Sequence, residues 1–201
     1  EGDPQSPYRI LRAVKNRFGQ TDAVGMFAMT EKGMMAVANP SARFLEERVH
    51  APGSAITCIM EGSRPLLIEV QALVEKSVFA NPIRRTSGFD AGRLQMLLAI
   101  IGRRAGVSVA GLDVYVNVIG GMPIKEHAAD LAVCVAVISS VRDQALPKEA
   151  VYIGEVGLSG EIRSVPFLDR RIKEADRLGF KQSITPKTTK NLRDIIQNAS
   201  R

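Results

Sequence analysis

An almost uninterrupted apolar run over residues 128–141 constrains the fold more than any other part of the sequence. Just before it, residues 112–119 alternate apolar and polar side chains, which predicts a strand. Gly120-Gly121-Met122-Pro123 then breaks the alternation. The apolar run is long enough for a helix buried on most of its sides, but shorter than the ~18 residues that a membrane-spanning helix needs. The sequence therefore predicts a strand, a glycine-containing loop and a buried helix in succession.

The rest of the sequence predicts strands first and a mixture of helices and strands later. Patterns typical of strands or hairpins cover residues 24–37, 54–61, 66–76, 151–153, 155–165 and 182–185. Helical patterns cover residues 41–47, 90–106, 169–178 and 187–199. Ser41 is the expected N-cap of the first of these helices. This order favours an α+β domain that runs from about residue 20 to the end of the sequence.

The composition is that of a globular protein with a surplus of positive charge. Apolar residues make up 45% and charged residues 24% of the chain, which excludes a disordered or collagen-like protein. Lys and Arg number 27 against 21 Asp and Glu, and this net charge of +6 permits a polyanionic partner. Cys58 and Cys134 each lie inside an apolar run, so we expect buried thiols rather than a disulfide or a metal site.

Several familiar site motifs are absent from the sequence. There is no GxxxxGK loop followed by Ser or Thr, and no GxSxG turn. His50 and His127 have no Cys or second His at ligand spacing. The residues alone therefore predict neither a nucleoside triphosphate site nor a metal site in this chain. Since no signal-peptide pattern is present either, we expect a protein of a reducing compartment with no membrane partner.

Two segments carry a more specific pattern. Residues 115–132 join the predicted strand to the buried helix, and residues 153–172 contain the hairpin Gly154-Glu155 … Leu158-Ser159-Gly160-Glu161-Ile162. Together they resemble the proteolytic domain of Lon proteases. There, a serine at the start of the helix is the nucleophile, and a lysine on the helix after the second segment is its base. The resemblance implies the α+β fold of Lon proteolytic domains, the ribosomal protein S5 domain 2-like fold.

The sequence departs from the Lon pattern at both catalytic positions. Lys125-Glu126 lies where Lon proteases have Lys-Asp, which places the nucleophile position at Ala129 and the base position at Asp169. A methyl group cannot attack a carbonyl, and a carboxylate cannot serve as the neutral amine of a Ser-Lys pair. We therefore predict no catalytic residue in this chain. Two alternatives remain open: a peptidase with an unrecognised nucleophile, and a protein-binding module that reuses the inactive cleft.

A short basic motif, Lys15-Asn16-Arg17-Phe18-Gly19, precedes the Lon-like part. In that position it resembles the linker of the RadA (Sms) family of bacterial DNA repair proteins, and this resemblance covers essentially the whole chain. It implies that residues 1–20 are the end of a RecA-like ATPase core with its linker, and that residues 21–201 are the Lon-like domain. We therefore expect the chain to be a fragment of a longer protein. Lys15 and Arg17 are suited to reach a neighbouring subunit's nucleotide or DNA phosphates; the alternative is a solvated linker.

The resemblance also implies the activity of the longer protein. We expect a cytoplasmic bacterial motor that hydrolyses ATP and processes branched recombination intermediates. Its implied partners are single-stranded and branched DNA, further copies of itself in a hexameric ring, and the RecA recombinase. ATP, Mg²⁺ and Zn²⁺ are implied as cofactors of the intact protein, with none in this fragment.

Two basic clusters are the candidate DNA contacts. They consist of Arg84, Arg85, Arg93, Arg103 and Arg104, and of Arg163, Arg170, Arg171 and Lys173. Arginine suits bidentate contact with phosphate, although a charged helix face is often only solvated. Because the nearby aromatic residues are only Phe89, Phe167 and Phe180, we expect sequence-independent backbone contact rather than base stacking.

Overall fold

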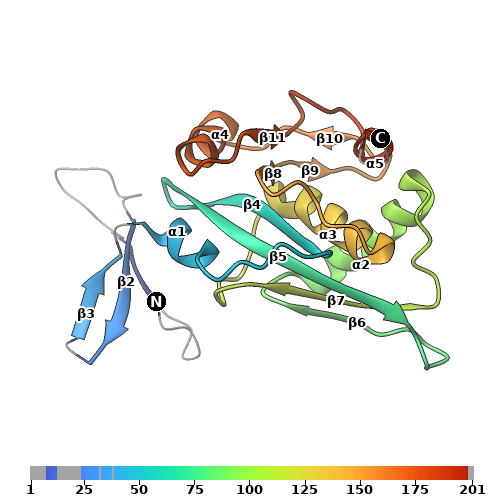
Figure 1. Ribbon diagram of the computed structural model, residues 1–201, viewed down its shortest axis with the longest axis horizontal. Coiled ribbons are helices and arrows are strands. Elements are labelled where there is room, and N and C mark those ends of the chain that lie inside the picture. The colour runs from blue at the N-terminus through green and yellow to red at the C-terminus, as the bar shows by residue number, and fades with distance from the viewer. Residues whose placement is uncertain (1–7, 13–23, 32, 38, 199–201) are drawn as a thin grey trace.

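The computed structural model describes residues 8–12, 24–31, 33–37 and 39–198, in which helices pack against both faces of a central mixed sheet (Figure 1). A mixed α and β class is therefore confirmed. The Lys15-Asn16-Arg17-Phe18-Gly19 motif and the boundary expected near residue 20 lie outside the described residues. Within the described ranges, no helix is long and apolar enough to cross a membrane.

Four strands in the order β4-β5-β7-β6 form the central sheet. Their bounds are Ser54–Glu61 for β4, Arg64–Lys76 for β5, Arg84–Ser87 for β6 and Leu112–Val118 for β7. β5 runs antiparallel to both β4 and β7, whereas β6 runs parallel to β7. The sequence predicted β4, β5 and β7 but not β6. The residues of β6 are polar and do not alternate with apolar ones, so they form a strand only because they pair with the edge of β7.

The first face of the sheet is covered by α2 (Ala91–Ile100) and α3 (Asp130–Arg142) (Figure 1). α2 begins at Asp90, whose carboxylate accepts a hydrogen bond from the backbone N–H of Arg93 at 2.6 Å. It continues as a π-helical turn, η1 (Ile101–Ala105), and ends at Gly106 with a φ of 72°. The helical spacing predicted over this segment is thus confirmed.

The buried helix predicted from the apolar run is α3. It follows a 3₁₀ turn, η2 (His127–Ala129), and every residue from Asp130 to Ser139 is buried. Because all sides of this helix are covered, its sequence shows no polar stripe. Both cysteines are buried in the core as expected.

A second layer packs beyond β4. β8 (Ala150–Tyr152) pairs in parallel with β11 (Gln182–Ile184), and β9 (Glu155–Val156) forms a hairpin with β10 (Ile162–Arg163). The layer also holds α4 (Leu168–Arg177) and α5 (Leu192–Asn198). The prediction of a closing helix from Lys187 is wrong for its first residues. Pro186 is followed by a turn in which the N–H groups of Thr188 and Thr189 both donate to the Thr185 carbonyl, so the helix begins only at Leu192.

The N-terminal strands form a separate small sheet, β1-β2-β3, with bounds Tyr8–Arg12, Val24–Thr30 and Gly33–Ala36. The predicted hairpin is present as β2 and β3, and Met26 of β2 is buried in the main core. α1 (Pro40–Leu45) follows. Its N-cap is Asn39 rather than Ser41: the Asn39 side chain accepts from the Ala42 N–H at 3.2 Å. The Ser41 hydroxyl instead accepts from the Leu67 N–H at 2.9 Å, which ties α1 to β5.

Candidate functional site

Ala129 and Asp169, the positions that the resemblance to Lon proteases assigns to the nucleophile and the base, have opposite environments. Ala129, in η2, is 0% exposed and belongs to the hydrophobic core. Asp169, in the first turn of α4, has a side chain that is 75% exposed. Nζ of Lys187 donates to its Oδ1 at 2.6 Å, and this hydrogen bond holds the pKa of the Asp169 carboxyl below its usual value. Neither position offers a nucleophile or a neutral amine.

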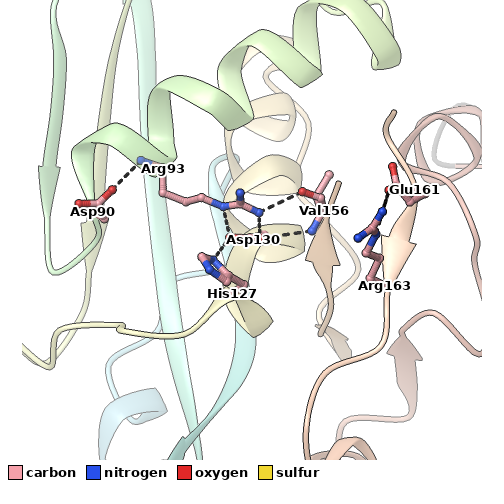
Figure 2. Close-up of polar contacts among 7 residues, drawn as sticks. All are labelled: Asp90, Arg93, His127, Asp130, Val156, Glu161 and Arg163. Atoms are coloured by element: carbon pink, nitrogen blue, oxygen red, sulfur yellow. Dashed lines mark hydrogen bonds and ion pairs between the residues drawn. The ribbon is translucent and has the colours of Figure 1, made fainter. Parts of the chain in front are cut away.

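The loop around Ala129 carries two acidic residues, and each is bound by an arginine from a distant part of the chain. The first is Asp130, which is fully buried at the start of α3 (Figure 2). Arg93 of α2 donates from Nε to Oδ1 at 3.1 Å and from Nη2 to Oδ2. Nη2 also donates to the Val156 carbonyl at 3.0 Å, while the Val156 N–H donates to Oδ2 at 3.3 Å. These bonds join α2, α3 and β9.

The electrostatics of Asp130 are dominated by burial. Taking the carboxylate out of water raises its pKa above the usual value, and the Arg93 guanidinium opposes that rise. The same hydrogen bonds raise the pKa of Arg93, which stays charged. Nδ1 of His127 lies 4.0 Å from Oδ1, with a side chain that is 60% exposed. The only cation in close contact with the buried carboxylate, among the described residues, is therefore Arg93.

The second acidic residue is Glu126, which lies just before η2. Arg171 of α4 binds it with two hydrogen bonds, of 2.7 Å to Oε1 and 2.6 Å to Oε2. Oε1 also accepts from the Met60 N–H at 2.7 Å. The Arg171 side chain is completely buried and donates further to the carbonyls of Cys58 and Pro166, at 2.5 and 2.9 Å. This cluster joins the loop to α4 and β4.

The hydroxyl groups farther along α3 are also used for structure. Ser139 accepts from the Gly53 N–H at 2.9 Å, and Ser140 accepts from the Val74 N–H at 2.9 Å. Burial raises the pKa of the Cys58 thiol to about 12 and that of Cys134 further still, so neither thiol is nucleophilic. Among the described residues, no group of three or more His, Cys, Asp or Glu side chains could hold a metal ion.

Three of the arginines predicted to bind DNA are engaged inside the protein. The prediction is wrong for Arg171, because no part of its side chain is exposed. Arg93 is bound to Asp130 and its side chain is only 14% exposed. The guanidinium of Arg84 donates to the carbonyls of Ile83, Leu112 and Val109. We therefore remove these three residues from the candidate DNA surface.

The six remaining candidates are exposed, but they do not lie together. They are Arg85, Arg103, Arg104, Arg163, Arg170 and Lys173. Arg103 and Arg104 lie on η1, against α5, and Nε of Arg104 donates to the Leu158 carbonyl at 3.2 Å. Arg170 and Lys173 lie on α4, at the opposite end of the second layer from α5 (Figure 1). The guanidinium of Arg170 stacks over Phe167 at 5.5 Å.

No local pattern in the sequence predicted that Glu126 and Asp130 hold this loop by pairing with Arg171 and Arg93. One signal was available for Asp130. A single acid inside an apolar helix has to be paired when the helix is buried, and a partner was therefore required somewhere in the chain.

This chain is similar in sequence to a known family model and to several known proteins. A family model described as subunit ChlI of Mg-chelatase matches residues 98–189, from the end of α2 through β7, α3 and most of the second layer. Proteins named DNA repair protein RadA are similar over nearly the whole chain. The protein from Aquifex aeolicus is 50% identical over 94% of this chain and 42% of its own length. Those from Pseudomonas aeruginosa and Escherichia coli are 51% and 49% identical, each over 92% of this chain and 41% of their own length.

The chain thus spans about two fifths of the length of these curated relatives. The match to the Aquifex aeolicus protein covers 188 residues of this chain, so it is not confined to one motif. With identity near one half over more than nine tenths of its sequence, this chain is homologous to the matching part of proteins named DNA repair protein RadA.

Proposed function

We propose that this chain is a non-catalytic, Lon-like domain of a RadA-type DNA repair protein. In this proposal it supports a homohexameric ring and binds DNA for an ATP-dependent motor that processes branched recombination intermediates. The observation that carries the non-catalytic assignment is the state of the two Lon positions: Ala129 is a buried methyl group, and Asp169 is an exposed acid paired with Lys187. The relatives named DNA repair protein RadA support the repair role.

The ion pairs around Ala129 explain why such a fold could persist without its chemistry. Glu126 and Asp130 flank the nucleophile position, and both are neutralised by buried or nearly buried arginines. Removing either arginine would leave a poorly solvated carboxylate, which is strongly destabilising. The loop is therefore retained as a structural junction between α2, α3, α4 and β9.

The exposed arginines support DNA contact. Arg103 and Arg104 follow each other on one turn, and Arg170 and Lys173 lie one turn apart on α4. Flexible cations of this kind neutralise phosphates without reading bases, so binding should weaken steeply as salt rises. Their separation on the molecule fits DNA that contacts several copies of the chain in a ring better than DNA held by one copy.

The remaining expectations concern the longer protein. ATP, Mg²⁺ and Zn²⁺ belong in this proposal to the intact protein, in the part of the relatives' length that this chain does not match. Lys15 and Arg17 remain candidates for coupling ATP to DNA. A bacterial cytoplasmic location and contact with a recombinase partner belong to the same proposal.

Three measurements on the 201-residue chain test the proposal. Titration of a labelled single-stranded oligonucleotide at low and at moderate salt should give binding that weakens steeply with salt. Light scattering should give the mass of a hexamer. Casein digestion and a serine-reactive probe should both be negative. Digestion or labelling would favour a peptidase with another nucleophile, and capture of a protein partner without DNA affinity would favour a protein-binding module.

A further inference from the structure

A hollow of about 520 Å³ lies on the face of the central sheet that points away from α2 and α3. The segment before and at the start of β4 forms one wall of it, through Val49, Ala51, Pro52, Gly53 and Ser54, and β5, β7 and β6 form its floor. α4 packs against this face only over β4 and β5, through the cluster that contains Cys58 and Leu67. The end of the sheet at β7 and β6 has no helix over this face in the part of the chain that the structure describes (Figure 1).

The strand register fixes which side chains reach the hollow. Leu73, Tyr115 and Arg85 lie directly opposite one another on β5, β7 and β6. The next row toward β4's start is Gln71, Asn117 and Ser87. Ala72 and Val116, between these rows, are buried in the main core on the opposite face, so both rows must point outward. Leu73 is 61% exposed, and Arg85, Asn117 and Ser87 are exposed as well.

The chemistry of the floor is unusual for an exposed sheet. In the first of these rows, the aromatic ring of Tyr115 on β7 lies between the aliphatic side chain of Leu73 and the guanidinium of Arg85. Neighbouring strands are about 4.8 Å apart, so the Arg85 side chain starts within one strand spacing of the ring. The residues that line the hollow include one cation and no carboxylate. This combination favours a flat, partly apolar ligand with a negative charge beside it.

We propose that this hollow binds single-stranded DNA, with an unpaired base stacked on Tyr115 and the adjoining phosphate held by Arg85. The proposal rests on the proposed function and adds to it a defined surface and a preference for unpaired bases. Sheet faces that combine an aromatic ring with a nearby cation are the platforms on which proteins commonly stack single-stranded bases. Bases in a duplex are already stacked on each other and cannot reach the ring.

One acidic residue, Glu75, limits the path that the single-stranded DNA can take across the sheet. Glu75 lies in the row beyond Leu73, opposite the buried Asp113, and is exposed. A phosphate passing over that row would be repelled. The single-stranded DNA therefore leaves the hollow over the side that carries Asn117 and Ser87. The amide and hydroxyl groups of these residues can donate hydrogen bonds to phosphates or bases.

The experiment measures binding of a fluorescent oligothymidine and of a blunt duplex at fixed, low salt. Tyr115→Ala should weaken binding to the single strand by roughly 5- to 150-fold, the loss expected for one stacked base, and leave duplex binding within about twofold. Tyr115→Phe keeps the ring and should restore most of the affinity. Tyr115→Leu keeps apolar volume without the ring and should behave like Tyr115→Ala, which separates stacking from a general apolar contact; unchanged duplex binding shows that the variants are folded. Glu75→Gln should tighten binding to the single strand.

Arg85→Gln and Arg177→Gln form a matched pair, because both remove one exposed positive charge. Only the first lies at the hollow; Arg177 is paired with Glu174 on α4. Equal effects of the two variants, or an unchanged single-strand affinity in both Tyr115→Ala and Tyr115→Leu, would overturn the stacking site while leaving DNA binding by the other arginines intact. A change of oligomeric mass in Tyr115→Ala at unchanged DNA affinity would instead make this face a subunit contact. No DNA binding by the unaltered chain would refute the proposed function itself.

Discussion

Replacing Arg93 by leucine should destabilise the protein strongly at neutral pH and much less at mildly acidic pH. The guanidinium of Arg93 is the close cationic partner of the fully buried Asp130 carboxylate. Arg93→Leu leaves this carboxylate with the Val156 N–H at 3.3 Å and with the more distant His127. An uncompensated buried charge of this kind typically costs about 3–5 kcal/mol.

The protonation equilibrium of Asp130 sets a ceiling on this cost. The carboxyl can take up a proton instead of staying charged. Protonation costs about 1.36 kcal/mol for each pH unit above the ordinary pKa of the carboxyl, and pH 7 lies roughly 3 units above it, so the cost at pH 7 is about 4 kcal/mol. At pH 5 the same ceiling is about 1.5 kcal/mol. In the variant the pKa of Asp130 is higher in the folded than in the unfolded state. Its folded state is therefore favoured as pH falls, and the loss of stability should shrink by about 2–3 kcal/mol between pH 7 and pH 5.

Urea unfolding followed by far-ultraviolet circular dichroism measures this effect, since the chain has no tryptophan to report by fluorescence. The double variant Arg93→Leu/Asp130→Asn removes the charge as well and should lose the pH dependence. Arg177→Leu is the control, because it breaks an exposed pair with Glu174 and should cost less than about 1 kcal/mol. A loss for Arg93→Leu that is below 1 kcal/mol, or equal at the two pH values, would refute the reasoning.

Three further predictions concern packing and reactivity. Arg171→Met should lower the free energy of unfolding by about 3 kcal/mol, since Glu126 loses its bidentate partner but stays 29% exposed; an unchanged urea midpoint would contradict this. Cys58 and Cys134 should react with a thiol reagent at pH 8 only when the chain is unfolded, because burial raises both thiol pKa values; rapid labelling of the folded chain would show otherwise. Gly53→Ala should lower the free energy of unfolding by at least about 2 kcal/mol, because φ is +84° and the new Cβ would lie 2.1 Å from the Ala72 carbonyl oxygen. In Gly102→Ala the new Cβ meets nothing within 4 Å, so the free energy of unfolding should change by less than about 1 kcal/mol.

Much of the fold could be predicted from local patterns. The apolar run predicted α3, alternation predicted β7, and runs rich in Ile, Val and Leu predicted β4 and β5. Each of these elements could be predicted because its own residues show that it is buried. β6 could not be predicted in this way, since its polar residues gain their strand conformation only from the edge of β7. The start of α5 was missed because Pro186 and Thr188 form a turn that competes with the helix.

The roles of the arginines depended on contacts that no local pattern records. Arg170 and Arg171 are neighbours on α4, yet one is exposed and the other is fully buried. What distinguishes them is Glu126, which lies 45 residues earlier in the chain. Arg93 likewise depends on Asp130, 37 residues away. Counting charges along the sequence therefore overestimated the surface available to DNA.

The dependence of DNA affinity on salt tests the central proposal most directly, namely that the exposed arginines of this chain bind DNA phosphates. For a single-stranded oligonucleotide, each phosphate contact contributes about 0.7 to the slope of log Kobs against log salt concentration. Arg103→Gln/Arg104→Gln should therefore reduce the magnitude of the slope by about 1.4, while the control Arg177→Gln leaves it unchanged. Identical slopes for the unaltered chain and the double variant, or affinity that does not depend on salt at all, would contradict the account.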